Sequence, residues 1–319
     1  MDHPLVSIVM PVFNTGGYLS EAIDSILQQQ PMDGCDVPIY ELIIVDDNSS
    51  DPETLAILDS APHLDARIQV LKNERKKGAS GGRNTGILHA RGQWIGFLDS
   101  DDMWLPNALA VRWRFILDNP EAKWIAAQYF LHKPALGLVE SPLSVRSPEL
   151  YSVIRGDYDA GRASRLECPV EMLAKNCMLQ TGTVLLRREL LLAKGMFNED
   201  LRRAEDYHLW FKCALDHDLW MLPFDVAVYR IRPGSLTHVG DPMYFCEDRM
   251  IALLLQDPAF EQYGHLLCER LNFVLGDYCY YYRRQKLYGE AFRWATEWVA
   301  KRPFAGAAWK QLLASALRI

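Results

Sequence analysis

The stretch Trp94-Ile95-Gly96-Phe97-Leu98-Asp99-Ser100-Asp101-Asp102 decides the fold. Its apolar half is typical of a buried strand, because Trp, Ile and Phe fit a pleated surface that other side chains cover. The residues that follow lead into a new helix, and Pro106 is expected to form its first turn. The carboxylates therefore come after the carboxyl end of a central strand, which is the edge where open α/β sheets bind ligands.

This acidic cluster holds three carboxylates within four residues. Such groups repel one another unless a cation or hydrogen-bond donors hold them. Hard divalent cations prefer oxygen ligands, and Mg²⁺ is commonly held by one or two carboxylates together with substrate phosphates. We therefore hypothesise a metal site that binds a diphosphate. A solvated acidic turn is the alternative, and it is the commoner explanation of an isolated Asp-x-Asp.

Three further strands are predicted ahead of the cluster by apolar runs at residues 5–10, 40–45 and 67–71. Apolar residues at helical spacing lie between these runs, for example over residues 18–30. Alternation of strands and helices is typical of a mostly parallel sheet with helices on both faces. The Gly-x-Gly-x-x-Gly of a dinucleotide-binding fold is absent after the first strand.

The rest of the chain divides into three parts. Residues 133–169 lack periodicity and are expected to form a long irregular excursion. A strand over 182–186, a helix over 188–194 and a last strand over 227–232 follow it. Beyond Asp241 the pattern is helical, so we expect an α/β domain at 1–240 and a helical region at 241–319. The last helix could dock on its own domain, on a second copy as a homodimer, or on a membrane surface.

Polar groups follow other strands as well. Asp46 and Asp47 come after the second strand, where a carboxylate could accept hydrogen bonds from a nucleobase, and Ser50 or Asp51 could cap the next helix. Residues 72–83 are basic and rich in glycine, which suits close approach to a phosphate but also describes a mobile loop.

Composition limits the functional class. The formal net charge of −7 argues against a large nucleic-acid surface. The seven cysteines show no C-x-x-C spacing, which favours reduced thiols over disulfides or zinc ligation. No signal peptide is recognisable at the start, and no apolar run reaches the roughly 18–20 residues that span a bilayer. These features predict a cytoplasmic protein that is soluble or peripheral at the membrane.

Five stretches in this order resemble the inverting glycosyltransferases of family 2, which have the Rossmann-like GT-A fold. The resemblance covers about the first three quarters of the chain, and its motifs are Pro11-Val12-Phe13-Asn14, Val45-Asp46-Asp47-Asn48-Ser49-Ser50-Asp51, Gly82-Arg83-Asn84, Asp99-Ser100-Asp101-Asp102 and Glu205-Asp206. Each motif is weak alone, but five in order are specific. The resemblance implies an α/β sheet of the GT-A type followed by a C-terminal helical extension.

The resemblance also implies roles for single residues. Pro11, Asn14 and Asp47 would contact the nucleotide, and Arg83 would lie near the diphosphate or position the acidic loop. Asp99 would approach the ribose. Mn²⁺ or Mg²⁺ would be held by acidic and imidazole ligands, namely Asp101, Asp102 and His238. Asp206, with Glu205 beside it, falls at the position of the catalytic base. Alternatively, these two carboxylates only stabilise a helix N-terminus.

The implied reaction moves a sugar from a nucleoside-diphosphate sugar, most simply a UDP-sugar, to an acceptor hydroxyl with inversion. The acceptor would be a glycan, a lipid-linked sugar or a protein in polysaccharide or glycoconjugate assembly. Two other classes stay open. A haloacid-dehalogenase-like phosphatase would use Asp99 as its nucleophile, but Met103 replaces the usual Thr or Val. A catalytically silent nucleotide-sugar-binding protein would not need the Glu205-Asp206 pair.

Overall fold

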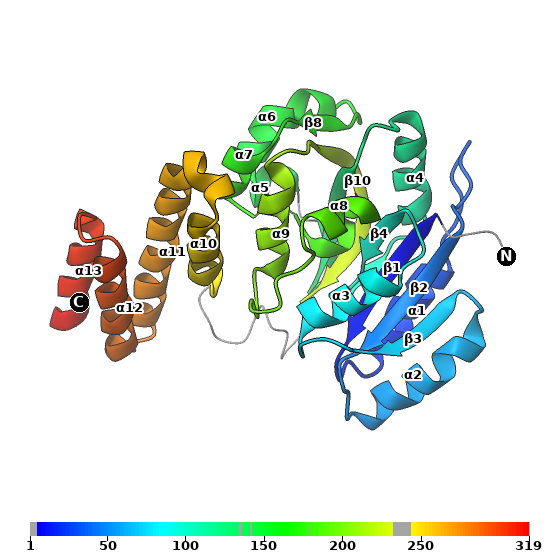
Figure 1. Ribbon diagram of the computed structural model, residues 1–319, viewed down its shortest axis with the longest axis horizontal. Coiled ribbons are helices and arrows are strands. Elements are labelled where there is room, and N and C mark those ends of the chain that lie inside the picture. Colours follow the sequence, from blue (N-terminus) through cyan, green and yellow to red (C-terminus); the bar gives the residue numbers. More distant parts are fainter. Residues whose placement is uncertain (1–4, 134–135, 141, 178, 232–243, 319) are drawn as a thin grey trace. The chain divides into compact units, whose positions relative to one another are not determined.

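The computed structural model describes residues 5–133, 136–140, 142–177, 179–231 and 244–318 (Figure 1). The chain divides into two compact units. One consists of Met1–Arg202 and Leu209–Arg232, and the other of Arg203–His208 and Pro233–Ile319. The central sheet lies in the first unit, and the C-terminal helices lie in the second.

Parallel strands form the first half of the sheet (Figure 1). In spatial order they are β3 (Ile68–Lys72), β2 (Tyr40–Asp46), β1 (Val6–Val12) and β4 (Trp94–Phe97). Every residue of β2 and β4 is buried, as expected for strands covered on both faces. The connecting helices are α1 (Tyr18–Leu27), α2 (Pro52–Leu64) and α3 (Ala79–His89). The predicted alternation of strands and helices is confirmed.

Helices cover both faces of this half of the sheet. Ile8 and Met10 of β1 share one apolar cluster with Ile26 of α1. Val9, between them in sequence, instead approaches α3, where a Cβ on Gly86 would lie only 2.3 Å from Val9 Cγ1. Because alternate residues of a strand point to opposite faces, α1 and α3 lie on opposite sides of the sheet.

Strands of mixed direction complete the sheet, whose full order is β3-β2-β1-β4-β9-β6-β10-β5. β9 (Leu185–Arg187) is antiparallel to both β4 and β6 (Trp124–Lys133). β6 is parallel to β10 (Leu219–Arg230), and β10 pairs antiparallel with β5 (Met103–Trp104). The acidic cluster lies between β4 and β5, so the sheet anchors this turn on both sides.

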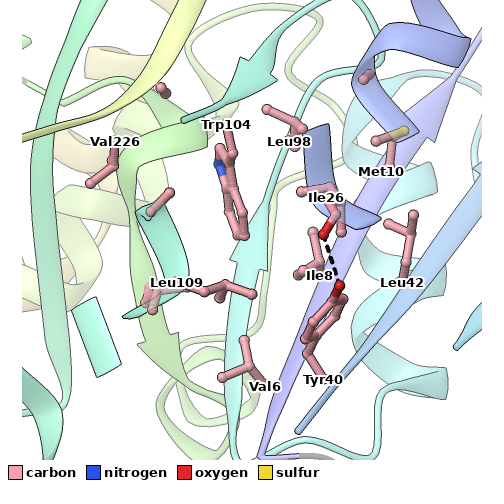
Figure 2. Close-up of a cluster of buried hydrophobic side chains, with 14 of the residues drawn as sticks. Val6, Ile8, Met10, Ile26, Tyr40, Leu42, Leu98, Trp104, Leu109 and Val226 are labelled. Carbon is pink, nitrogen blue, oxygen red and sulfur yellow. Dashed lines mark hydrogen bonds between the residues drawn. The ribbon is translucent and has the colours of Figure 1, made fainter. Parts of the chain in front are cut away.

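An apolar core packs against the sheet and fixes both ends of the acidic turn (Figure 2). Leu98 enters the core just before the turn, and Trp104 enters it just after. The indole nitrogen of Trp104 donates to Gly182 O at 2.7 Å, and the Arg112 guanidinium lies 4.0 Å from the Trp104 ring centroid. Full burial of a large apolar side chain stabilises a fold by about 1.5–3 kcal/mol. The turn is therefore held in place by strong packing on each side.

The segment expected to be irregular contains regular elements instead. Within residues 133–169 the chain forms β7 (Gly137–Val139), α5 (Leu143–Arg146), α6 (Pro148–Tyr158) and β8 (Ser164–Leu166). The prediction was wrong because α6 buries only Leu150 and Ile154, which is too few to produce a visible period. Pro148 is the first residue of α6, where its missing N–H is not needed.

Other elements agree with expectation except at their ends. α4 (Ala108–Asp118) begins after Pro106 rather than at it, and the strand expected over 182–186 is divided into a 3₁₀ turn (Thr181–Thr183) and β9. The first unit also contains the short helices α7 (Val170–Lys175) and α8 (Arg188–Ala193). Helix α9 (Glu205–Ala214) begins in the second unit and continues in the first from Leu209. All seven cysteines are free thiols, as predicted.

The second unit contains the predicted C-terminal helices. They are α10 (Glu247–Gln256), the 3₁₀ helix η3 (Pro258–Tyr263), α11 (Gly264–Arg284), α12 (Tyr288–Lys301) and α13 (Gly306–Leu317). Tyr278 and Trp294 meet between α11 and α12 with their ring centroids 4.6 Å apart. Gly276 leaves room for Trp298, because a Cβ there would lie 3.3 Å from that ring. None of the helices in the described ranges is long and apolar enough to cross a membrane.

We expect Gly86→Ala to destabilise the fold. The new Cβ would lie 2.3 Å from Val9 Cγ1, so α3 or β1 must shift, which costs about 1–3 kcal/mol of unfolding free energy. Gly156→Ala in α6 is the matched control, because a Cβ there meets no atom within 4 Å. Urea unfolding compares the two variants with the parent. Equal stability of the Gly86→Ala protein and the parent would contradict the close packing of α3 on β1.

Candidate active site

Polar side chains tie together the loops that follow β1, β2 and β4. Asn14 Oδ1 accepts hydrogen bonds from Ser50 N at 2.7 Å and from Asp51 N at 2.9 Å. Thr15 Oγ1 and Ser100 Oγ share a buried hydrogen bond of 2.7 Å. Because the three parallel strands end at one edge of the sheet, these bonds join the loops into a single surface at that edge.

The loops after β1 and β2 also have local reasons for their shape. Asn14 has a φ of 47°, a left-handed conformation that asparagine tolerates better than most residues. Asp51 is the N-cap of α2, and its Oδ2 accepts from Thr54 N at 2.8 Å. The hydrogen bond from the Thr54 hydroxyl, and then this backbone bond, lower the pKa of Asp51. Asp51 therefore supplies the helix cap, which leaves Asp47 available for another role.

Asp47 fastens the basic loop to the end of β2. Its side chain is buried, with Oδ1 accepting from Asn73 Nδ2 at 2.6 Å and Oδ2 accepting from Gly78 N at 2.8 Å. Asn73 Oδ1 in turn accepts from Thr85 Oγ1 at 3.0 Å. The carboxylate thus positions the loop in addition to any contact with a nucleotide.

The basic, glycine-rich loop is fixed by several contacts rather than solvated throughout. A Cβ on Gly81 would lie 1.9 Å from Lys76 O, so only glycine allows the backbone to fold back this closely. Arg75 forms an ion pair with Glu199, and Lys76 Nζ lies 2.7 Å from Asp200. These pairs hold the loop against the turn before α9 and favour an ordered loop over a mobile one.

Arg83 connects this loop to the acidic cluster. Its Nη2 lies 2.7 Å from Asp99 Oδ1, and only 4% of the Arg83 side chain is exposed, against 34% for Asp99. The guanidinium carbon also lies 5.2 Å from the Phe197 ring centroid. Arg83 is therefore a buried cation beside the carboxylates. This position agrees with the second role considered for Arg83, which is to position the acidic loop.

The carboxylates of the cluster have different surroundings. Asp102 is buried, with Oδ1 accepting from Arg230 N at 2.9 Å and Oδ2 accepting from Gln180 Nε2 at 3.0 Å. Burial, and then the negative charges of Asp99 and Asp101, raise the pKa of Asp102 well above its ordinary value. Asp101 is only partly buried. Asp102 therefore serves to join β5 and β10, and Asp101 is the better placed of the two to meet a ligand.

The donor chemistry suits a divalent cation that is shared with a substrate. No set of three or more His, Cys, Asp or Glu side chains in the described part of the chain is arranged to hold a metal ion by itself. Mg²⁺ and Mn²⁺ do not require such a cage when one carboxylate, water and substrate phosphates complete the ligands. The partly buried Asp101 carboxylate, two residues after Asp99 and its partner Arg83, fits that second arrangement.

Glu205 and Asp206 begin helix α9 in the second unit. Asp206 Oδ1 accepts from Tyr207 N at 2.7 Å. Nearby in the same unit, Glu247 is paired with Arg270 at 2.8 Å. Burial raises the pKa of Glu247 to about 7 against the effect of Arg270, and the charge of Asp206 adds to the rise. Asp206 therefore lies within electrostatic reach of a buried carboxylate as well as at the start of a helix.

The predicted site residues are distributed as follows. One edge of the sheet in the first unit carries Pro11, Asn14, Asp47, Arg83, Asp99, Asp101 and Asp102. Glu205 and Asp206 lie in the second unit, and His238 lies outside the described residues. Sequence reasoning missed Asn73, Gln180 and Arg230. Only Asn73 had a signal, since it follows β3 directly and is polar.

Comparison with known proteins identifies the family. A family model described as glycosyl transferase family 2 matches residues 7–131. WfgD of Escherichia coli, a UDP-Glc:alpha-D-GlcNAc-diphosphoundecaprenol beta-1,3-glucosyltransferase, is 31% identical over 240 residues, which cover 74% of this chain and 81% of that protein. The chain belongs to glycosyl transferase family 2. The family predicted from the five motifs is confirmed.

Solved structures agree with the fold of this family 2 glycosyltransferase. Staphylococcus aureus TarS 1-349 in complex with UDP-GlcNAc aligns with a TM-score of 0.62 at 18% identity, covering 97% of this chain and 88% of that one. The mannosyltransferase PcManGT of Pyrobaculum calidifontis, in complex with GDP-Man and Mn²⁺, aligns with a TM-score of 0.59 at 19% identity, covering 100% and 87%. The predicted GT-A fold is confirmed. The phosphatase alternative is disfavoured, because its nucleophile would be Asp99, which is paired with Arg83.

Proposed function

We propose that this glycosyltransferase moves a sugar from a nucleoside-diphosphate sugar, with a UDP-sugar as the expected donor, to an acceptor hydroxyl with inversion. The observation that carries the proposal is the Arg83–Asp99 pair beside Asp101, at the sheet edge where three loops meet. Both relatives that are named with a UDP-sugar, WfgD and TarS, support the choice of donor. We further propose that residues 1–240 form the transferase domain and 241–319 its helical region.

Arg83 is proposed to bind the donor diphosphate. Guanidinium groups complement phosphate as well as carboxylate, and a buried one retains more of its electrostatic strength than an exposed one. Asp99, which is partly exposed, keeps Arg83 oriented and is proposed to contact the ribose. Pro11, Asn14 and Asp47 are proposed to form the nucleotide end of the same site.

The divalent cation is proposed to use Asp101 in preference to Asp102, because both oxygens of Asp102 already accept hydrogen bonds from the protein. His238 remains a proposed further ligand. A bound Mn²⁺ or Mg²⁺ would neutralise charge that develops on the leaving diphosphate. The Mn²⁺ named with PcManGT supports a metal of this type.

Asp206 is proposed as the general base, with Glu205 beside it. The acceptor oxygen forms a bond to the anomeric carbon while the bond from that carbon to the diphosphate oxygen breaks. The acceptor proton passes to the Asp206 carboxylate, and the electron pair of the broken bond stays on the nucleoside diphosphate. Attack from the side opposite the leaving group inverts the configuration, and no covalent enzyme intermediate is needed.

The acceptor is proposed to be a lipid-linked glycan of polysaccharide assembly. The diphosphoundecaprenol in the name of WfgD supports this class. The test is incubation with single UDP- and GDP-sugars, Mn²⁺ or Mg²⁺, and GlcNAc-diphosphate-lipid acceptors, followed by measurement of nucleoside diphosphate and of the anomeric configuration of the product. Metal-dependent release with an inverted product is expected. Phosphate release from simple esters, or donor binding without turnover on any acceptor, would contradict the proposal.

We expect Asp47→Ala to weaken donor binding more than turnover. The change leaves Asn73 Nδ2 and Gly78 N without their acceptor. The free energy of holding the basic loop in its binding conformation then rises by about 1–3 kcal/mol. Donor affinity should therefore fall by about tenfold or more. Calorimetry with the donor measures the effect, and Asp59→Ala on the exposed surface of α2 is the control for loss of a charge. Unchanged donor affinity would rule out a role for Asp47 in the nucleotide site.

A further inference from the structure

Helix α13 presents large apolar side chains to solvent. Phe304, in the turn before the helix, is 99% exposed, and Trp309, Leu313 and Leu317 are 49%, 62% and 68% exposed. The last three are spaced by four residues, so they lie on one side of the helix. Trp309 Nε1 donates to Pro303 O at 2.8 Å, which holds the indole against the turn that carries Phe304. We call these four residues the α13 face.

The opposite side of α13 already packs against the neighbouring helices, so the α13 face is not needed to complete the core of its own unit. Ala308 and Ser315, which are small, are the buried side chains of α13, and the helix packs against α11 and α12. An amphipathic helix that completes a core normally turns its large apolar residues inward. Here the buried side chains are small and Leu312 on their side is only half-buried, whereas Trp309, Leu313 and Leu317 face outward. α13 therefore docks on its own unit through Ala308, Ser315 and the half-buried Leu312, and the stripe of Trp309, Leu313 and Leu317 remains for another contact.

Charge distinguishes this part of the chain from the rest. Residues 283–318 contain eight Lys and Arg but only two Glu, a net charge of +6 within a chain of −7. Six of the eight form no ion pair with any residue that the structure describes, namely Arg283, Arg284, Lys286, Arg302, Lys310 and Arg318. Lys310 lies three residues before Leu313 and seven before Leu317, and is therefore on the side of the stripe.

We propose that the α13 face docks on an anionic phospholipid bilayer, with Phe304, Trp309, Leu313 and Leu317 entering the headgroup region. Interfacial helices combine Trp, Phe and Leu with Lys and Arg. The α13 face supplies the aromatic and aliphatic side chains, and Arg302, Lys310 and Arg318 are the basic residues next to it in the sequence. Anionic lipids attract basic segments near the surface. A two-fold contact with a second copy would instead bring two segments of +6 together. A nucleic acid would be bound by the basic residues but would leave the apolar stripe uncovered. The inference goes beyond the proposed transfer reaction and does not depend on it.

The test is sedimentation of the full chain with vesicles of phosphatidylcholine alone or mixed with phosphatidylglycerol. Binding to the mixed vesicles is expected to be stronger and to weaken in high salt, because the attraction is partly electrostatic. Phe304→Asp together with Leu313→Asp should lower binding by at least about tenfold. The matched control is Leu64→Asp together with Leu117→Asp, which are exposed on α2 and α4 of the other unit.

Folding is checked by circular dichroism, and Lys310→Glu with Arg318→Glu provides a second variant that leaves the apolar side chains intact. This second variant should lose the preference for phosphatidylglycerol. The proposal is overturned if the wild type does not sediment with mixed vesicles. It is also overturned if the double Asp variant of the α13 face and the double Asp control variant lower vesicle binding equally. It is also overturned if light scattering finds a dimer that Leu313→Asp separates. Release of nucleoside diphosphate from the UDP-sugar donor during transfer to a water-soluble acceptor should stay normal in these variants, so the two proposals can fail separately.

Discussion

Asp101→Asn is expected to abolish sugar transfer and to weaken metal-dependent donor binding by at least about tenfold. The reason is that a neutral amide is a poorer ligand for a hard cation than a carboxylate, so charge on the donor diphosphate stays uncompensated. Because Asp101 is only partly buried, the fold should be retained. Calorimetry with the UDP-sugar, with and without Mn²⁺, measures the loss separately from turnover.

Asp102→Asn is the matched control for this prediction. Asp102 accepts from Arg230 N and Gln180 Nε2, and an asparagine can replace only one of these acceptors. We therefore expect a lower melting temperature but a donor affinity that still responds to Mn²⁺. If Asp101→Asn keeps normal metal-dependent turnover and Asp102→Asn loses it, the metal ligand is Asp102 instead.

The parts of the site that were predictable from sequence depend on short-range rules. Apolar runs that end in polar residues locate the carboxyl ends of strands, which is why Asp47 and Asp99 could be assigned to one edge of the sheet. The family resemblance implied two alternative roles for Arg83, and the ion pair with Asp99 agrees with the one that positions the acidic loop. The family resemblance added roles that spacing alone could not supply.

The parts that were not predictable depend on long-range packing. β10 starts at Leu219, whereas the sequence pattern predicted a start near 227. The first half of the strand was missed because Pro223 and Asp225 interrupt its alternation of apolar and polar residues. The strand nevertheless continues by shifting register against β6 around Asp225. Likewise, the sequence pattern does not distinguish Asp102 from the other two carboxylates of the cluster. In the structure its oxygens accept hydrogen bonds from Arg230 and Gln180, each more than 70 residues away. No local pattern indicates which acidic residue a distant strand will bury.

α13 illustrates the same limit for surfaces. Its pattern of Trp309, Leu313 and Leu317 predicts an amphipathic helix but not which side faces inward. The small Ala308 and Ser315 decide the matter by allowing close approach to the neighbouring helices. Periodicity therefore identified the helix, and only the packing identified its exposed face.

Asp206→Asn carries most of the functional claim, because Asp206 is proposed to act on the acceptor hydroxyl alone. Asn can still accept the hydrogen bond from Tyr207 N through its side-chain oxygen, so the start of α9 should remain intact. Loss of a general base typically lowers a rate by about 10²–10⁴, and transfer should fall by at least that much. Donor affinity and its response to Mn²⁺ should stay close to those of the parent.

A purely structural role for Asp206 makes a different forecast for the same variant. If the carboxylate only stabilises the helix N-terminus, asparagine is an adequate substitute, and stability should change by about 0.3–1 kcal/mol while transfer continues. Glu205→Gln is the neighbouring control, because it removes an adjacent charge from the same helix turn. Transfer rate, donor affinity and melting temperature, measured on both variants, separate the two accounts. A folded, donor-binding and inactive Asp206→Asn protein supports the base assignment, whereas a folded and active one would transfer that assignment to Glu205 or exclude this mechanism.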